Sequence, residues 1–197
     1  MSILALTSDT LIGTPATGNL EYNGQFFGTD SNASRAQLQR IVRATAVTCA
    51  GQTSIDFTSI PAWVERITVM FSGVSTSGTS NIQIQLGSGS FTTSGYLGGF
   101  ATFGGTAGSM SAGYVVANNV AAANLHFGSI LITNITSNTW AEFGNIANSS
   151  GSNAVTVSGG SIALGGTLDR LRITTVNGTD TFDTTPSAGT INILYEG

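Results

Sequence analysis

The sequence predicts an all-β protein, an antiparallel two-sheet sandwich of the jelly-roll kind preceded by an extended N-terminal arm. Short runs rich in Ile, Val and Thr alternate between apolar and polar residues, most regularly at residues 81–86. Alternation with a period of two is typical of strands that bury one face. Clusters of Gly, Ser and Asn separate the runs, and these residue types form turns.

Nine short strands are expected, each identified by alternation or by β-branched residues. They cover residues 40–48, 64–71, 81–86, 114–117, 128–135, 139–146, 154–157, 168–176 and 190–196. Short antiparallel strands with Gly and Asn turns fit a jelly roll better than an open sheet, because the edges of a sheet need protection. An immunoglobulin-like sandwich is the alternative.

The first 45 residues differ in pattern from the rest. Asn23-Gly24 lies between two extended runs, residues 20–22 and 25–27, and Asn-Gly between such runs is a strong hairpin signal. Ser and Asn at positions 31 and 32 could cap a short helix over residues 33–39. A lone hairpin is marginally stable in water, so this segment needs a neighbouring chain or an assembly. We therefore divide the chain into an arm, residues 1–45, and a β-sandwich domain, residues 46–197.

Composition and charge exclude several functional classes. The 197 residues include 6 Arg or Lys and 10 Asp or Glu, for a net charge of −4. Scattered Arg residues give no basic stripe of the kind that binds phosphates, so we expect no nucleic-acid partner. The N-terminus lacks a basic region followed by a long apolar run, and the chain has no apolar run of 18 residues. We therefore expect neither a signal peptide nor membrane insertion.

Catalytic and metal-binding residues are sparse. His126 is the only histidine, and its apolar neighbours favour a packing role over that of a general base. Cys49 is the only cysteine and fits a small buried hydrophobe. Oxygen ligands for Ca²⁺ could come from residues 177–183, but a polar turn whose side chains bond its own backbone is the preferred interpretation. We expect no enzymatic activity, no metal and no other cofactor.

Three arginines are expected in ion pairs. Arg170 and Arg172 are two residues apart in a predicted strand and so share one side of it, and Arg66 lies in another predicted strand. Their expected partners are Glu65, Asp169 or Glu142.

The segment of residues 13–29, Gly-Thr-Pro-Ala-Thr-Gly-Asn-Leu-Glu-Tyr-Asn-Gly-Gln-Phe-Phe-Gly-Thr, is followed by Arg35. It resembles a segment common in bacteriophage tail fibre and virion appendage proteins. Later stretches resemble the C-terminal domains attached to such segments: residues 60–76, 82–87, 169–175, 177–183 and 191–196. The sequence departs from the family in one respect, because fibres normally carry a long shaft and here the matched segment begins close to Met1.

The resemblance implies a virion structural protein, usually a homotrimer, which carries its β-sandwich as a tip that binds a host surface glycan or protein. Such a protein is made in the host cytoplasm and becomes part of the tail or the particle surface. The matched segment would attach it to other virion proteins through Leu20, Glu21, Tyr22, Phe26 and Phe27. A decoration protein with a purely structural role is one alternative, and a glycan depolymerase is another.

A receptor-contact region is expected within residues 87–113. This segment holds nine Gly and no charged residue, together with Phe91, Tyr96, Phe100 and Phe103. Long segments without a strong pattern are often functional, and aromatic faces stack on sugar rings or fill apolar pockets. Alternatively, these aromatic side chains pack beneath a long loop or between subunits.

Overall fold

The computed structural model describes residues 10–11, 13–14, 16–23, 25–118, 120–122, 124–149, 154–184 and 188–197. The chain divides into two compact units, Met1–Arg40 and Ile41–Gly197, and each is described here by itself. Every regular element of the described residues is a β-strand. Within those residues the structure therefore has no helix of the length and hydrophobicity needed to cross a membrane.

The smaller unit is a three-stranded antiparallel sheet. It has the order β1 (Leu20–Tyr22), β2 (Phe26–Thr29) and β3 (Arg35–Gln37). Pairing of Leu20 with Gly28 and of Tyr22 with Phe26 confirms the predicted hairpin.

The helix predicted over residues 33–39 is wrong. Asp30 Oδ1 accepts the backbone N–H groups of Asn32 and Ser34, each at 2.9 Å, so this polar cluster closes a turn instead of capping a helix. The chain then returns as β3, in which Arg35 pairs with Thr29. Strand pairing with β2 satisfies the backbone groups that a helix would have bonded internally.

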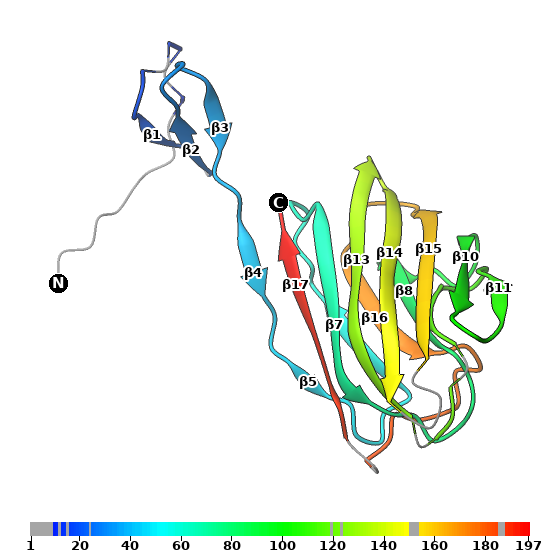
Figure 1. Cartoon of the computed structure of the whole chain (residues 1–197). Coiled ribbons are helices and arrows are strands. Elements are labelled where there is room, and N and C mark those ends of the chain that lie inside the picture. The colour runs from blue at the N-terminus through cyan, green and yellow to red at the C-terminus, as the bar shows by residue number, and fades with distance from the viewer. Residues whose placement is uncertain are drawn as a thin grey trace. The chain divides into compact units, whose positions relative to one another are not determined.

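The larger unit is a sandwich of two antiparallel sheets (Figure 1). The larger sheet contains β4 (Ile41–Arg43), β5 (Val47–Thr48), β7 (Arg66–Val74), β10 (Leu97–Thr102), β11 (Ala107–Ser109), β13 (Leu125–Thr136), β14 (Thr139–Ser149), β15 (Val155–Ala163) and β17 (Thr190–Glu196), in the order β11-β10-β15-β14-β13-β7-β17-β4 with β5 also paired to β17. The smaller sheet contains β6 (Ser54–Thr58), β8 (Ile82–Ser88), β9 (Ser90–Phe91), β12 (Tyr114–Ala117) and β16 (Arg170–Thr175), in the order β12-β8-β16-β6 with β9 paired to β8.

From β6 onward the chain passes repeatedly from one sheet to the other. Strands β6, β8, β12 and β16 lie in the smaller sheet, whereas β7, β10, β13–β15 and β17 lie in the larger one. This alternation is jelly-roll-like, with the meander β13-β14-β15 filling a position that a single strand takes in a simple jelly roll. The predicted all-β sandwich is confirmed, and each of the nine predicted strand segments contains strand residues.

The core lies between the two sheets and is built from the inward-facing residue of each alternating pair. Ile67, Val69, Ile130 and Ile132 come from the larger sheet, and Ile84, Leu86, Leu171 and Ile173 come from the smaller sheet, all fully buried. Cys49 is also buried in this core, where burial raises the pKa of its thiol to about 12. Its predicted packing role is confirmed.

The larger unit begins at Ile41, whereas the sequence placed the domain boundary after residue 45. The register of β4 places Arg43 opposite Leu194, and that of β5 places Thr48 opposite Thr190. Both strands therefore cover one edge of β17, whose other edge pairs with β7.

We expect a fragment of residues 41–197 to melt cooperatively and a fragment of residues 49–197 to melt about 4–8 °C lower. The shorter fragment loses the strand pairs of β4 and β5, a loss of about 2 kcal/mol if a few backbone hydrogen bonds contribute about 0.5–1.5 kcal/mol each. Calorimetry of both fragments checks this. Equal melting temperatures would show that β4 and β5 add no stability.

Candidate functional site

A polar groove lies on the outer face of the smaller sheet. In β16, Leu171 and Ile173 point into the core while Arg172 and Thr174 point outward. In β8, Gln83 and Gln85 alternate in the same way with Ile82, Ile84 and Leu86 of the core and line the floor of the groove, where the glutamines are 3% and 6% exposed. The two-residue period of the strands therefore gives this face its polar side chains.

The groove has a volume of about 220 Å³. Its lining is almost entirely polar: Thr53, Ser54, Gln83, Gln85, Arg172, Thr174, Thr175, Val176, Asn177 and Gly178. Backbone carbonyls hold the amide groups in place, because Gln85 Nε2 donates to Ala112 O at 2.9 Å and Gln83 Nε2 donates to Thr175 O at 3.5 Å. Planar hydrogen-bonding groups are thus held at fixed positions on a rigid sheet.

Phe91 stacks against the arginines at this face. The centre of its ring lies 4.1 Å from Arg172 Cζ and 5.8 Å from Arg170 Cζ, within the range of cation–π attraction. Arg172 also donates from Nε and Nη2 to Asp56 Oδ1 and Oδ2, at 2.8 and 2.7 Å. These hydrogen bonds to the Asp56 carboxylate raise the pKa of the Arg172 guanidinium. The aromatic ring and the forked ion pair together fix the orientation of Arg172.

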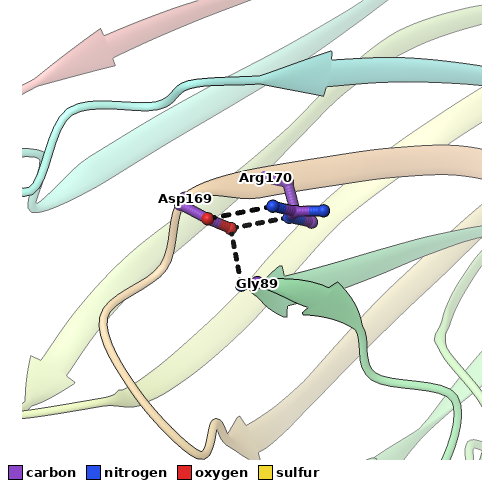
Figure 2. A network of polar contacts seen from close by, with 3 residues as sticks. All are labelled: Gly89, Asp169 and Arg170. Atoms are coloured by element: carbon purple, nitrogen blue, oxygen red, sulfur yellow. Dashed lines mark hydrogen bonds and ion pairs between the residues drawn. The ribbon is translucent and has the colours of Figure 1, made fainter.

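A second ion pair holds the hairpin that carries Phe91 (Figure 2). Asp169 Oδ1 accepts the Gly89 N–H at 3.1 Å and Arg170 Nε at 2.7 Å, and Asp169 Oδ2 accepts Arg170 Nη2 at 3.1 Å. Hydrogen bonding from Arg170 is the main reason that the pKa of Asp169 lies below its ordinary value. Gly89 has φ +70°, which glycine adopts without strain. The tight turn from β8 to β9 therefore places Phe91 back over β16.

The expected arginine pairs are confirmed in part. Arg170 pairs with Asp169 as expected. Arg172 pairs with Asp56, and Arg66 pairs with Glu196 across β7 and β17. Glu65 and Glu142, the other two expected partners, pair with neither of these arginines, because strand register decides which carboxylate faces each guanidinium.

The four aromatic residues predicted to contact a receptor do not form one surface. Tyr96 is 2% exposed, and its ring meets the ring of Tyr114 edge-on at 4.9 Å. Its hydroxyl oxygen accepts the Leu86 N–H at 2.7 Å, and burial raises its pKa to about 12. Assigning Tyr96 to a receptor surface is therefore wrong, since its side chain belongs to the core.

The other three aromatics reach the surface to different degrees. Phe91 lies half-buried beside the groove, as described above. Phe100 is also half-buried, and its ring packs over Gly108 in the neighbouring strand β11. Phe103 is 92% exposed in the turn between β10 and β11.

About half of residues 87–113 lie in strands, those of β8 to β11, so the long patternless loop predicted for them is wrong. Glycines serve strand pairing here: Gly98 lies opposite Gly160, and Gly99 lies opposite Gly159. A Cβ atom on Gly98, which has φ +144°, would collide with the backbone of Gly159 and Gly160. Only glycine permits this close approach of β10 and β15.

The predicted attachment residues lie in the three-stranded sheet of the smaller unit. Glu21 is buried and accepts Arg35 Nε at 2.7 Å. Leu20 and Phe26 are exposed, and the Phe26 ring lies 5.0 Å from that of Tyr22. Phe27 is half-buried. This sheet thus buries an ion pair and leaves large apolar side chains in solvent.

The remaining candidate groups lie apart from the groove or form turns. His126 is buried, its Nδ1 donates to Val74 O at 3.0 Å, and burial lowers its pKa. Asn177 Oδ1 accepts the N–H groups of Thr179 and Asp180 at 3.0 and 3.1 Å, which is the self-bonded turn expected there. No cluster of three or more His, Cys, Asp or Glu placed to hold a metal occurs among the described residues.

Comparison of the chain with protein-family models, curated proteins and solved structures gave no match. What the groove binds is therefore argued from its own side chains. Sequence reasoning singled out Phe91 and Arg172 for separate reasons and did not connect them. The Gln-Ile-Gln alternation at residues 83–85 was the available signal for the groove, since a strand with one buried face presents both glutamines on the other face.

Proposed function

We propose that this protein is a bacteriophage virion appendage subunit, homotrimeric, whose β-sandwich binds a host surface glycan in the polar groove. The resemblance of residues 13–29 to tail fibre segments supports the virion assignment. The observation that carries the binding function is the groove itself, with an aromatic–arginine stack beside it.

The chemistry of the groove suits a sugar. Amide and guanidinium groups such as those of Gln85 and Arg172 supply donors and acceptors in fixed planes, which match the paired hydroxyls of a sugar ring. An aromatic face such as that of Phe91 stacks on the apolar face of the ring. The volume of about 220 Å³ lies below that of pockets for drug-sized ligands, and so suits one small polar unit of a longer chain.

The arm would attach the subunit to other virion proteins. Leu20 and Phe26 are exposed on a sheet of only three strands, and Leu38, the residue after β3, is exposed as well. Such a small sheet cannot cover its own apolar side chains, and a contact with another virion protein would remove them from water. Glu21 and Arg35 would hold the sheet in shape while this contact forms.

Binding to host cells and to a panel of host surface glycans tests the groove. We expect Arg172→Lys to weaken binding at least tenfold, because a lysine ammonium has neither the forked donors nor the flat face of guanidinium. Phe91→Ala is expected to weaken it comparably, since aromatic truncation at a binding site costs about 2 kcal/mol. Fluorescence titration with the labelled protein measures both losses.

The matched control is Arg66→Lys. Arg66 also pairs with a carboxylate on a strand, that of Glu196, but it lies in the larger sheet. The Arg66→Lys substitution is expected to leave glycan binding unchanged. If the wild-type protein binds no glycan, or if both groove variants bind as the wild type does, the groove is not the receptor site.

One observation favours the structural alternative, a decoration protein. Several large apolar side chains lie exposed on the larger sheet, among them Leu97, Phe143 and Val157, and such a surface suits assembly. Particles that lack the subunit would then adsorb to cells normally but lose stability. No comparable observation favours a depolymerase, because Glu142 lies inside the core and Asp56, Asp169 and Glu196 each pair with an arginine.

A further inference from the structure

The outer face of strands β10, β13, β14 and β15 has several large exposed apolar side chains among small polar ones such as Ser129 and Asn145. Its exposed large side chains are Leu97, Phe127, Leu131, Phe143, Val155 and Val157. They come from the four adjacent strands β10, β15, β14 and β13 (Figure 1). The outward-facing described residues of these strands include no Asp, Glu, Lys or Arg.

Phe143 forms a projection on this face with a hollow beside it. Its side chain is 69% exposed, and it lies opposite Leu131 on one side and Gly159 on the other. Gly159 in turn lies opposite Gly99, so the adjacent part of the sheet has no side chains. The result is an open hollow of about 450 Å³, lined by Gly99, Phe100, Ala101, Gly108, Val157 and Gly159 with Phe143 at its border.

The face is large enough for a stable contact. The four adjacent strands of this face, β13, β14, β15 and β10, spaced about 4.8 Å apart and about nine residues long, present roughly 600 Å². Specific interfaces bury from about 600 to about 1,000 Å² on each partner. Most of this face would therefore be covered in a single contact of ordinary size.

We propose that this face binds the same face of a second copy of the chain around a two-fold axis. The Phe143 ring of each copy occupies the hollow of the other. Because the projection and its hollow lie on one face, a single rotation satisfies both, which is the condition for an isologous contact. Two identical faces without charge also meet without repulsion, whereas a partner of different sequence would have to supply its own matching hollow.

The test is the molar mass in solution, measured by light scattering on the full chain. One chain has a mass of 20.1 kDa. Pairing through this face is expected to double the molar mass of the assembly that the chain forms without this contact. We expect Phe143→Asp to halve the mass, because it would bury two charges against apolar surface. Circular dichroism shows whether the variant is folded.

A second variant tests the hollow instead of the projection. Gly159→Leu adds a side chain where a Cβ atom meets nothing closer than Glu142 O at 3.8 Å, so it fills the hollow from within without a backbone clash. It too should halve the mass. The control is Val176→Asp, which places the same charge on an apolar side chain 48% exposed on the turn after β16 and should leave the mass unchanged.

Two outcomes would overturn the proposal. One is a wild-type protein that stays at the mass of one chain up to about 100 μM, above the micromolar Kd of weak interfaces of this size. The other is a folded Phe143→Asp or Gly159→Leu variant that keeps the wild-type mass. Neither outcome depends on glycan binding, so the groove and this face are tested separately.

Discussion

Replacing Tyr96 by alanine is expected to lower the free energy of unfolding by about 3–5 kcal/mol, the usual cost of deleting a buried aromatic ring. The ring of Tyr96 packs edge-on against Tyr114 at 4.9 Å. Its hydroxyl accepts the Leu86 N–H, so the truncation also leaves a buried backbone donor without its partner. Chemical denaturation at constant pH measures the loss.

Two companion variants help to interpret this loss of stability, one by isolating the hydroxyl group and the other by serving as an exposed control. Tyr96→Phe keeps the ring and removes only the hydroxyl, and it should cost about 1 kcal/mol. Phe103→Ala changes another aromatic of the same segment, but one that is 92% exposed, and should alter stability by no more than about 0.5 kcal/mol. If Tyr96→Ala and Phe103→Ala were equally stable, Tyr96 would not be part of the core.

Glu142 is expected to make the protein less stable as the pH rises towards 7. Its side chain is 3% exposed between the sheets. Ser158 Oγ donates to its Oε1 at 2.6 Å, while Oε2 is buried without a hydrogen-bond partner. Burial raises the pKa of this carboxyl from 4.5 to about 7, and the Ser158 hydrogen bond only partly opposes the rise.

The direction follows from proton linkage. The folded state binds the Glu142 proton more tightly than the unfolded state does, so protonation of Glu142 favours folding. This contribution to the free energy of unfolding is fully present below about pH 4.5, decreases as the pH rises to about 7, and is constant above that. A shift of this size corresponds to about 3 kcal/mol. His126, whose pKa is lowered by burial, acts in the opposite direction as the pH falls.

Glu142→Gln isolates the contribution of Glu142. Glutamine keeps the shape of the side chain and cannot ionise. The free energy of unfolding of the variant should therefore exceed that of the wild type by up to about 3 kcal/mol at pH 8 and equal it near pH 4.5. Denaturation of both proteins across this range gives the difference, from which the contribution of His126 cancels. Parallel profiles for the two proteins would show that Glu142 is not buried in its charged form above pH 7.

The fold class could be predicted from local pattern because burial of one face imposes a period of two on the sequence. Residues 81–86 illustrate this, since every second residue of that run reaches the core. The pairing of residues 20–22 with residues 26–28 was predicted from the Asn-Gly pair between them in the sequence, although Gly24 itself lies outside the described residues. Such features depend on neighbours in the chain, and the sequence contains that information directly.

Tertiary pairing decided the features that the sequence misassigned. The glycines of residues 98–99 looked like loop residues, yet they allow β10 to approach the equally glycine-rich segment of β15, about sixty positions later in the chain. Residues 33–39 had a possible helix cap, yet β2 offered them a strand to pair with.

The groove shows the same division between what the sequence determined and what the tertiary structure decided. Alternation by itself determined that Gln83, Gln85 and Arg172 lie on the strand faces that point away from the apolar core. Only the tertiary structure decided that β8 and β16 are neighbours and that β9 folds back to lay Phe91 on Arg172. The physical reason is that periodicity specifies which face of a strand is buried, whereas the identity of the neighbouring strand depends on packing between segments distant in sequence.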